Sequence, residues 1–205
     1  MFDRQIQNFT QKPLIIIAKV FLKFLKPNQM TILGFILGFF MCILVFFQFY
    51  LAALALLILN RFCDGLDGTM ARLTTPTPLG GYLDIVSDFT IYSGFILAFG
   101  LSNSSYIYLS MVLLFLYIGT ATTFLAKAAI QNQLEKISET NNALEELPKS
   151  FHYTSGLVEG TETIIFMFLC LLLPNFFVFI SIIFGILCLI TFISRVIVCY
   201  VEFNL

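Results

Sequence analysis

Four of the five aspartates in the chain lie close together, in two strongly apolar segments. Asp64 and Asp67 are spaced i, i+3, and Asp84 and Asp88 are spaced i, i+4, so each pair falls on one face of a helix. A carboxylate within a membrane span costs at least about 2.5 kcal/mol, which makes four unpaired ones unfavourable. Four hard oxygen ligands at one place predict Mg²⁺ or Mn²⁺, and they suffice for two ions in a phosphoryl-transfer site.

Small residues accompany these carboxylates. Gly68 and Ala71 lie on the face of the first aspartate pair, and Gly80 and Gly81 lie one turn before the second pair. Residues without large side chains leave room for a nucleotide or a phosphate to approach the backbone. The alternative is that the acids are helix ends solvated at the membrane interface, but their ordered spacing favours a site.

The composition indicates a membrane protein. Of 205 residues, 59% are hydrophobic and 11% are charged, and the mean hydropathy is +0.95. A soluble globule of this size cannot bury so much apolar surface. The formal net charge is −1 and no basic tract is present. These values exclude a soluble enzyme, a disordered chain and a nucleic-acid-binding protein.

We therefore expect an all-α integral membrane protein with six transmembrane helices, since backbone polar groups in lipid must be satisfied within the helix. The spans are predicted at residues 28–49, 51–72, 79–101, 106–132, 154–173 and 176–201. Residues 1–27 are predicted to form a cytoplasmic, interfacial amphipathic helix, with Lys19 and Lys23 on one face. Residues 28–205 then form a single membrane domain.

The charged residues predict the orientation of this domain. The connections at 48–52, 101–106 and 173–176 carry no charge, whereas the Lys and Arg residues lie in or next to the other connections and the chain ends. Gln133–Ser150 is predicted to be a polar loop on the charged side. By the positive-inside rule, both termini and the aspartates face the cytoplasm. We expect a bacterial inner membrane.

The two aspartate segments resemble a known signature. Asp64–Arg72 reads D-G-L-D-G-T-M-A-R and Gly80–Asp88 reads G-G-Y-L-D-I-V-S-D. Together they are similar to D-x-x-D-G-x-x-A-R…G-x-x-x-D-x-x-x-D, the signature of the CDP-alcohol phosphatidyltransferase (CDP-alcohol phosphotransferase) family. The spacer between them has seven residues, where eight is common. Pro27–Thr31 also resembles the P-N-x-x-T element that opens the first span of that family.

The resemblance implies an enzyme that displaces CMP from a CDP-alcohol, usually CDP-diacylglycerol in bacteria, when a small polar alcohol attacks the β-phosphate. It implies two Mg²⁺ or Mn²⁺ ions held by Asp64, Asp67 and Asp84, with Asp88 beside the metals and acting as general base. The residues implied to bind CDP are Asn28, Thr31, Gly68, Ala71 and Arg72. The family is commonly dimeric, so a homodimer in the lipid bilayer is expected.

Four other charged residues are candidates for binding the acceptor. Lys127 is either a cation of the acceptor pocket or an interfacial Lys that snorkels to the surface. Arg195 lies inside the last predicted span, where an Arg is a functional candidate. Glu159 and Glu162 either pair with these cations or contact a hydroxylated or cationic acceptor. The mixture of charges weakens the case for glycerol 3-phosphate.

Two other functions are compatible with the same aspartates. A phosphotransferase of the CDP-choline or CDP-ethanolamine type would use diacylglycerol as the acceptor. A divalent-cation transporter would place the aspartates near the middle of the membrane, usually between internal repeats. The chain has no evident repeat, and its acids lie toward one side, which disfavours the transporter. The sequence does not identify the acceptor alcohol.

Overall fold

The computed structural model describes residues 13–140 and 157–203, without the side chains of residues 134–140 and 203. Every regular element in these ranges is helical. Residues 13–21 form a helix. The elements that follow are α2 (Pro27–Phe46), α3 (Tyr50–Leu73), α4 (Pro78–Ser102), η1 (Ser104–Tyr106), α5 (Ile107–Thr140), α6 (Gly160–Leu172), η2 (Pro174–Phe176) and α7 (Phe177–Phe203).

Four segments of the described chain are long and apolar enough to cross a membrane. They are Pro27–Phe46, Pro78–Ser102, Ser104–Gln133 and Pro174–Glu202. Helix α6 is apolar but has only 13 residues, fewer than the roughly 20 that span a bilayer. Helix α3 is long enough, but its second half carries the charged residues that end the apolar run. The structure thus supports a helical membrane protein with four candidate spans and one shorter apolar helix.

Two helix boundaries differ from the sequence prediction. Helix α5 continues to Thr140, through the first part of the predicted loop 133–150. That part is rich in Gln, Leu, Glu and Lys, which are good helix formers. Helix α6 begins at Gly160 and not near residue 154, and residues 154–156 lie outside the described part. The remaining predicted loop residues also lie outside it.

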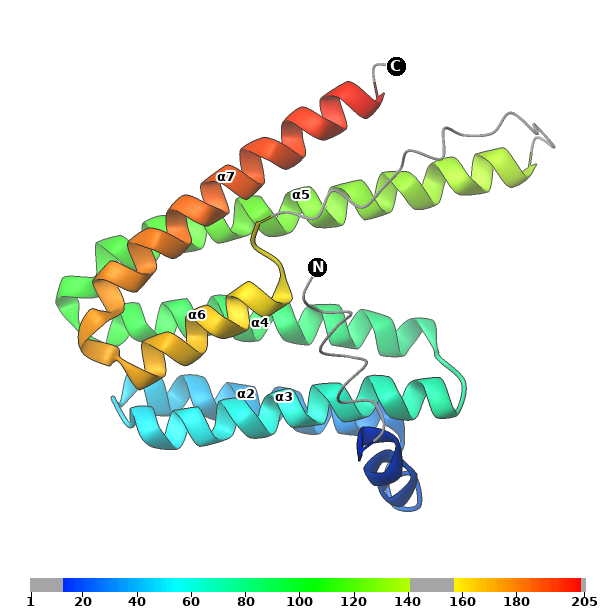
Figure 1. Cartoon of the computed structure of the whole chain (residues 1–205), viewed down its shortest axis with the longest axis horizontal. Coiled ribbons are helices and arrows are strands. Elements are labelled where there is room, and N and C mark those ends of the chain that lie inside the picture. Colours follow the sequence, from blue (N-terminus) through cyan, green and yellow to red (C-terminus); the bar gives the residue numbers. More distant parts are fainter. Residues whose placement is uncertain (1–12, 141–156, 204–205) are drawn as a thin grey trace.

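The helices form two groups (Figure 1). Helix α2 packs against both α3 and α4, α5 packs against α7, and α4 and α6 connect the two groups. The short connections α2–α3, α4–α5 and α6–α7 lie at one end of the bundle, on the left in Figure 1. The α3–α4 turn lies at the opposite end. This arrangement agrees with the predicted separation of uncharged and charged connections.

Aromatic side chains form the core near the end with the short connections. The ring of Phe99 on α4 lies between Tyr50 on α3, at a centroid distance of 5.5 Å, and Phe177 on α7, at 4.3 Å. Phe166 on α6 stacks on Phe184 of α7 at 4.1 Å. These stacked pairs add to the stabilisation from buried apolar area. They fix four helices relative to one another at the end away from the aspartates.

Glycines allow the closest helix contacts. A Cβ atom on Gly38 of α2 would lie 2.4 Å from the Ile91 Cδ1 atom of α4. A Cβ atom on Gly100 of α4 would lie 2.7 Å from the Ser110 Cβ atom of α5. Small residues at such crossings let helix backbones approach closely in a membrane. The positions of α2 and α5 against α4 therefore depend on these glycines.

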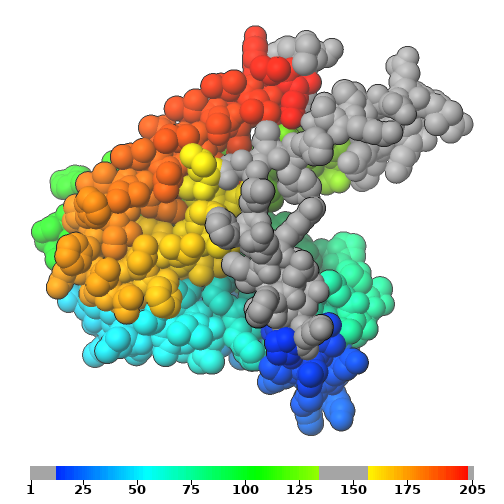
Figure 2. Space-filling view, in the orientation of Figure 1, coloured from blue at the N-terminus to red at the C-terminus, as the bar shows by residue number. Residues whose placement is uncertain are grey.

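The segment before α2 covers the ends of α2 and α3. Leu14, Ile17 and Phe21 pack against a buried cluster that includes Leu66 and Met70 of α3. On its outer side Ile16, Val20 and Phe24 are exposed, together with Lys19 and Lys23. The segment (blue) forms one corner of the molecule in Figure 2. It therefore rests on the part of α3 that carries the first two aspartates.

Gly100→Ala should destabilise the protein, because Ser110 Cβ belongs to the rigid part of a side chain and cannot move away from the new methyl group. We expect a loss of about 1–3 kcal/mol, seen as a lower melting temperature in detergent. Gly160→Ala is the matched control, since a Cβ there meets no atom within 4 Å. Equal melting temperatures for Gly100→Ala and the wild type would contradict this packing argument.

Candidate active site

The two aspartate pairs lie on helices that are joined by one short turn. Asp64 and Asp67 are in the carboxyl-terminal half of α3, and Asp84 and Asp88 are in the amino-terminal half of α4. Thr77 caps α4 by accepting a hydrogen bond from a backbone N–H of its first turn. The α3 and α4 backbones make few close contacts, because α2 packs against both. Contact between them at the aspartates therefore depends on long side chains.

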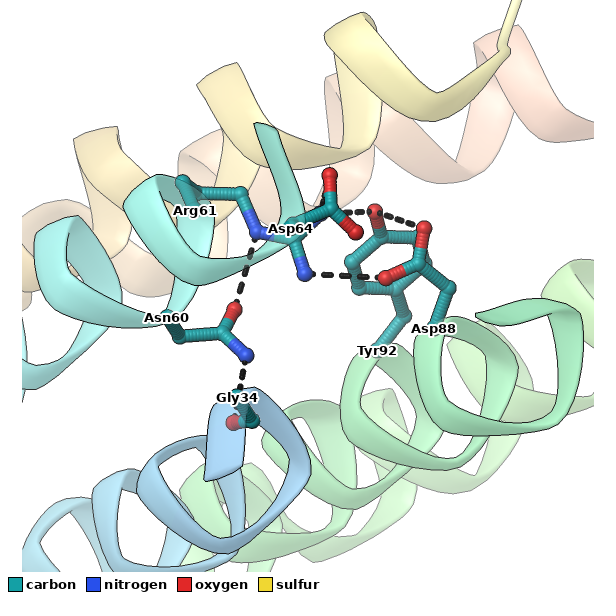
Figure 3. A network of polar contacts seen from close by, with 6 residues as sticks. All are labelled: Gly34, Asn60, Arg61, Asp64, Asp88 and Tyr92. Carbon is teal, nitrogen blue, oxygen red and sulfur yellow. Dashed lines mark hydrogen bonds and ion pairs between the residues drawn. The ribbon is translucent and has the colours of Figure 1, made fainter. Parts of the chain in front are cut away.

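A hydrogen-bonded network centred on Arg61 joins α3 to α4 (Figure 3). Arg61 Nη2 donates to Asp88 Oδ1 at 2.8 Å, and Arg61 Nη1 donates to the Tyr92 hydroxyl at 2.8 Å. The Tyr92 hydroxyl in turn donates to Asp88 Oδ2 at 2.9 Å. Arg61 Nη1 also lies 3.6 Å from Asp64 Oδ2. One guanidinium therefore faces a carboxylate from each aspartate pair.

Asn60 ties the same network to α2. Its side-chain oxygen accepts a hydrogen bond from Arg61 Nε at 2.8 Å, and its Nδ2 donates to the Gly34 carbonyl at 2.8 Å (Figure 3). Only 2% of Asn60 is exposed. A buried amide with both ends bonded is held in one orientation. The position of Arg61 is therefore set by the backbone of α2 as well as by α4.

The other two aspartates have different environments. Asp67 is buried and interacts with the Thr31 side chain, but its Oδ2 atom has no hydrogen-bond partner in the described structure. Asp84 is exposed. All four carboxylates are within electrostatic range of one another. In the described ranges, however, no three His, Cys, Asp or Glu side chains converge closely enough to surround a metal ion.

The residues predicted to bind CDP gather at the same end of the bundle. Asn28 and Thr31 lie in the first turns of α2, and Gly68, Ala71 and Arg72 lie in the last turns of α3. A Cβ on Gly68 would lie 3.4 Å from Arg72 Nη1, so the missing side chain leaves room for the guanidinium. Arg72 is exposed and donates to the neighbouring Thr69 hydroxyl at 3.1 Å.

Helices α2 and α4 also meet here. A Cβ on Gly80 would lie 3.0 Å from Asn28 Oδ1, whereas a Cβ on Gly81 would meet nothing within 4 Å. The amino-terminal ends of the two helices thus approach each other next to the aspartates. Helix amino termini carry unpaired N–H groups and favour negative charge. This end of the molecule combines carboxylates, one exposed Arg and two helix amino termini.

The predicted acceptor residues do not form one cluster. Lys127 on α5 forms an ion pair with Glu202 on α7, with Nζ 2.8 Å from Oε2, and both side chains are largely buried. Glu159 and Glu162 form a reciprocal cap at the start of α6, in which the Glu159 N–H donates to Glu162 Oε2 at 3.0 Å. The ion-pair partner of Lys127 is therefore Glu202, and the two glutamates cap α6.

Arg195 is nearly buried, with 6% of its surface exposed. Its Nη1 atom donates to the Thr120 carbonyl of α5 at 3.2 Å, and its guanidinium lies 5.7 Å from the centre of the Phe124 ring. The Glu159 carboxylate is within electrostatic range. Arg195 thus joins α7 to α5, and the predicted proximity of the α6 glutamates holds for Glu159.

Comparisons with known proteins identify the family of the chain. The family model for CDP-alcohol phosphatidyltransferase matches residues 24–193, which is most of the chain. The chain belongs to this family. Its relatives include the inner membrane protein YnjF of Escherichia coli (strain K12), which is 40% identical over 178 residues, covering 84% of this chain and 82% of that protein.

A second relative matches a smaller part of the chain. The bifunctional IPC transferase and DIPP synthase of Aquifex aeolicus (strain VF5) is 43% identical over 63 residues. This match covers 30% of this chain and 14% of that protein. The family model confirms the predicted family, which is a transferase family. The apolar helices and the inner membrane relative confirm the predicted membrane nature.

Members of the CDP-alcohol phosphatidyltransferase family generally use divalent metal ions, and the residues of this chain fit such ions. Carboxylate oxygens are the ligands that Mg²⁺ and Mn²⁺ prefer. Asp67 Oδ2 supports the fit directly, because a buried carboxylate oxygen without a partner is unfavourable unless another cation satisfies it. Because Asp84 is exposed, one side of the aspartate cluster is accessible from solvent.

The sequence interpretation missed two tyrosines next to the aspartate network, Tyr92 and Tyr117. Tyr92 bonds to Asp88 and follows it by four residues, so extending the helical face could have identified it. Tyr117 on α5 packs edge-on against Tyr92, at a centroid distance of 6.5 Å, and interacts with Thr163 of α6. No sequence spacing reveals Tyr117, because it reaches the site from another helix. These contacts connect the aspartates with α6.

Glu202→Gln should lower the stability of the protein, because Lys127 then loses its carboxylate partner between α5 and α7. The expected loss is about 1.5–3 kcal/mol, typical of a hydrogen bond to a charged group. Thermal unfolding in detergent measures it. The exchanged double variant Lys127→Glu/Glu202→Lys should recover most of the loss. A double variant less stable than Glu202→Gln would show that the ion pair is not the main contact.

Proposed function

We propose that this chain is a membrane phosphatidyltransferase that transfers the phosphatidyl group of CDP-diacylglycerol to a polar alcohol and releases CMP. The observation that carries the proposal is the meeting of Asp64 and Asp88, from two different helices, at the Arg61 guanidinium. It supports a single site formed by the two signature segments, 64–72 and 80–88. Family membership supplies the reaction class.

Asp64, Asp67 and Asp84, with Asp88 beside them, are the residues that would hold two Mg²⁺ or Mn²⁺ ions in this proposal. Bound ions of this kind polarise phosphoryl oxygens and stabilise the charge that develops during transfer. The partnerless Oδ2 of Asp67 and the exposure of Asp84 support these assignments. Asn60 on α3 would support the cluster through its contact with Arg61, and Thr31 on α2 through its contact with Asp67.

Asp88 is the general base in this proposal. It accepts the proton of the acceptor hydroxyl while the hydroxyl oxygen forms a new bond to the β-phosphorus. The bond between the β-phosphorus and the bridging oxygen breaks, and CMP leaves with that oxygen. Arg61 and Tyr92 each occupy one Asp88 oxygen, and an ionised carboxylate retains further acceptor positions. These two bonds hold the carboxylate facing α3.

The CDP moiety would bind at Asn28, Thr31, Gly68, Ala71 and Arg72. The exposed guanidinium of Arg72 is the group suited to the phosphates, because a planar fork of donors matches phosphate oxygens. The amino terminus of α2 is nearby, and the positive end of its helix dipole favours the same negative charge. Gly68 leaves space for Arg72 to move toward the donor.

The acceptor would enter beside Lys127, Glu159, Glu162 and Arg195. The link from Tyr92 through Tyr117 to the start of α6 supports this position. Six helices would cross the membrane as one domain, 28–205, after an interfacial amphipathic segment, 1–27. Both termini and the site would face the cytoplasm of a bacterial inner membrane, where the chain would act as a homodimer. The inner membrane relative supports this location.

Release of CMP tests the proposed function. Purified protein in detergent, with CDP-diacylglycerol and Mn²⁺ or Mg²⁺, should release CMP when one of a panel of acceptors is added. The panel contains glycerol 3-phosphate, serine, inositol, inositol phosphate and choline. Asp88→Asn should lower the rate at least about 100-fold, the usual contribution of a general base. Asp3→Asn, the same change outside the signature segments, is the matched control and should retain activity.

Other results of this assay would change the proposed function. If no acceptor gives CMP but CDP-choline or CDP-ethanolamine with diacylglycerol does, the donor assignment is wrong and the reaction class is retained. If no donor gives CMP and the protein carries Mn²⁺ into liposomes, the chain is a cation transporter. An Asp88→Asn variant with wild-type CMP release would exclude Asp88 as the general base.

Removal of divalent ions should stop CMP release, because the family generally uses them and the carboxylates of this site fit them. Dialysis against EDTA followed by the same assay measures this effect. Adding Mg²⁺ or Mn²⁺ should restore the rate. Asp67→Asn should shift the Mn²⁺ concentration for half-maximal rate upward by about tenfold or more. Undiminished CMP release in excess EDTA would exclude a role for the metals.

A further inference from the structure

Arg61 is the most enclosed cation of the aspartate region. Its side chain is 15% exposed, whereas Arg72 on the same helix is exposed. Arg61 lies 2.8 Å from Asp88 Oδ1 and 3.6 Å from Asp64 Oδ2. In the described residues Arg72 forms no ion pair with a carboxylate. The single charge of Arg61 is therefore placed among the same oxygens that would bind metal.

Arg61 is held in this position from three sides. Asn60 accepts from Nε, the Tyr92 hydroxyl accepts from Nη1, and the guanidinium carbon lies 5.4 Å from the centre of the Tyr92 ring. Asn60 is itself bonded to the Gly34 carbonyl of α2. A guanidinium fixed by so many directional contacts is not a mobile surface cation.

A fixed cation at this place opposes a divalent ion. An ion bound to Asp88 Oδ1 at about 2 Å would lie within about 5 Å of Arg61 Nη2. Like charges at that separation repel strongly in a partly buried site. The repulsion is smaller on the side of Asp67, because among the described residues that carboxylate forms no ion pair with Arg61 and its Oδ2 atom has no hydrogen-bond partner. The two sides of the cluster therefore differ in their affinity for metal.

We propose that Arg61 is an internal counterion that competes with one divalent ion for Asp64 and Asp88, and so keeps the metal affinity on that side of the cluster low. Arg61 is thus a positioning residue that acts through the two carboxylates. The inference rests on the proposed function, since it concerns the ions of the same site.

Binding of Mn²⁺ alone tests the inference. Metal-free full-length protein in detergent, without nucleotide, is titrated with Mn²⁺, and the free ion is followed by electron paramagnetic resonance. Arg61→Gln should bind Mn²⁺ about tenfold or more tightly than the wild type, because one fixed positive charge is removed. Arg61→Lys retains the charge and should bind Mn²⁺ as the wild type does. A merely structural role would weaken binding in both variants.

Arg72→Gln is the matched control, because it removes the same charge from α3 away from the carboxylate contacts. It should change the Mn²⁺ dissociation constant less than Arg61→Gln does. An Arg61→Gln variant that keeps its helix content but binds Mn²⁺ no more tightly than the wild type overturns the inference. If wild type and variant both fail to bind Mn²⁺, the metal part of the proposed function fails with it.

A second comparison applies if Arg61→Gln does not fold, since removal of one partner of a buried ion pair is destabilising. Asp88→Asn is then compared with the double variant Arg61→Gln/Asp88→Asn, which removes both partners and is better tolerated. The double variant should bind Mn²⁺ several-fold more tightly than Asp88→Asn, through Asp64. Equal affinities overturn the inference. If the wild-type protein releases CMP while either overturning result is obtained, the inference fails and the proposed function stands.

Discussion

The ion pair between Arg61 and Asp88 is the contact on which the rest of the site depends. Helix α2 packs against both α3 and α4, so the two aspartate-bearing helices come together mainly through side chains. A carboxylate or a guanidinium left alone in this partly buried position would be strongly unfavourable. The pair, with Tyr92 on one side and Asn60 on the other, removes that cost and fixes α2, α3 and α4 in one arrangement. The Arg61 side chain joins the two signature segments.

The two ends of the bundle have different physical roles. At the end with the short connections, stacked rings such as Phe99 on Phe177 fill the space between helices, and Gly100 lets α5 approach α4. This apolar packing needs no water and gives a rigid frame. At the other end, apolar packing continues around Leu66 and Met70, and charged side chains link α3 to α4, whose backbones make few close contacts. The polar groups of the site therefore lie next to a frame that apolar packing already stabilises.

Much of this arrangement could be predicted from the sequence, and the remainder depends on contacts between distant residues. The aspartate spacings within α3 and α4 follow from local helix geometry, and the family signature adds which helices must meet. The partner of Arg61 was not predictable, because Asp88 is 27 residues away and lies on another helix. The same holds for Lys127 and Glu202, which are 75 residues apart. The i, i+3 spacing of Glu159 and Glu162 is typical of a reciprocal helix cap, whereas their charge favoured an interpretation as ion-pair partners. The length of α6 and the extension of α5 were missed because hydropathy marks apolar runs and not helix ends.

Under the proposed function, the charges around Lys127, Arg195 and the α6 glutamates bear on which alcohol could be the acceptor. Glu202 pairs with Lys127. Glu159 and Glu162 together cap α6, and Glu159 is also within electrostatic range of Arg195. Arg195 itself donates to a backbone carbonyl and faces the Phe124 ring. A phosphorylated acceptor would need a surplus of positive charge, because its phosphate gives up strong hydration on binding. The described residues provide nearly equal numbers of acids and bases here, and both α6 glutamates would repel a phosphate. Unless Arg195 exchanges its carbonyl partner for the acceptor, this balance favours an uncharged hydroxyl compound or a cationic alcohol over a sugar or glycerol phosphate.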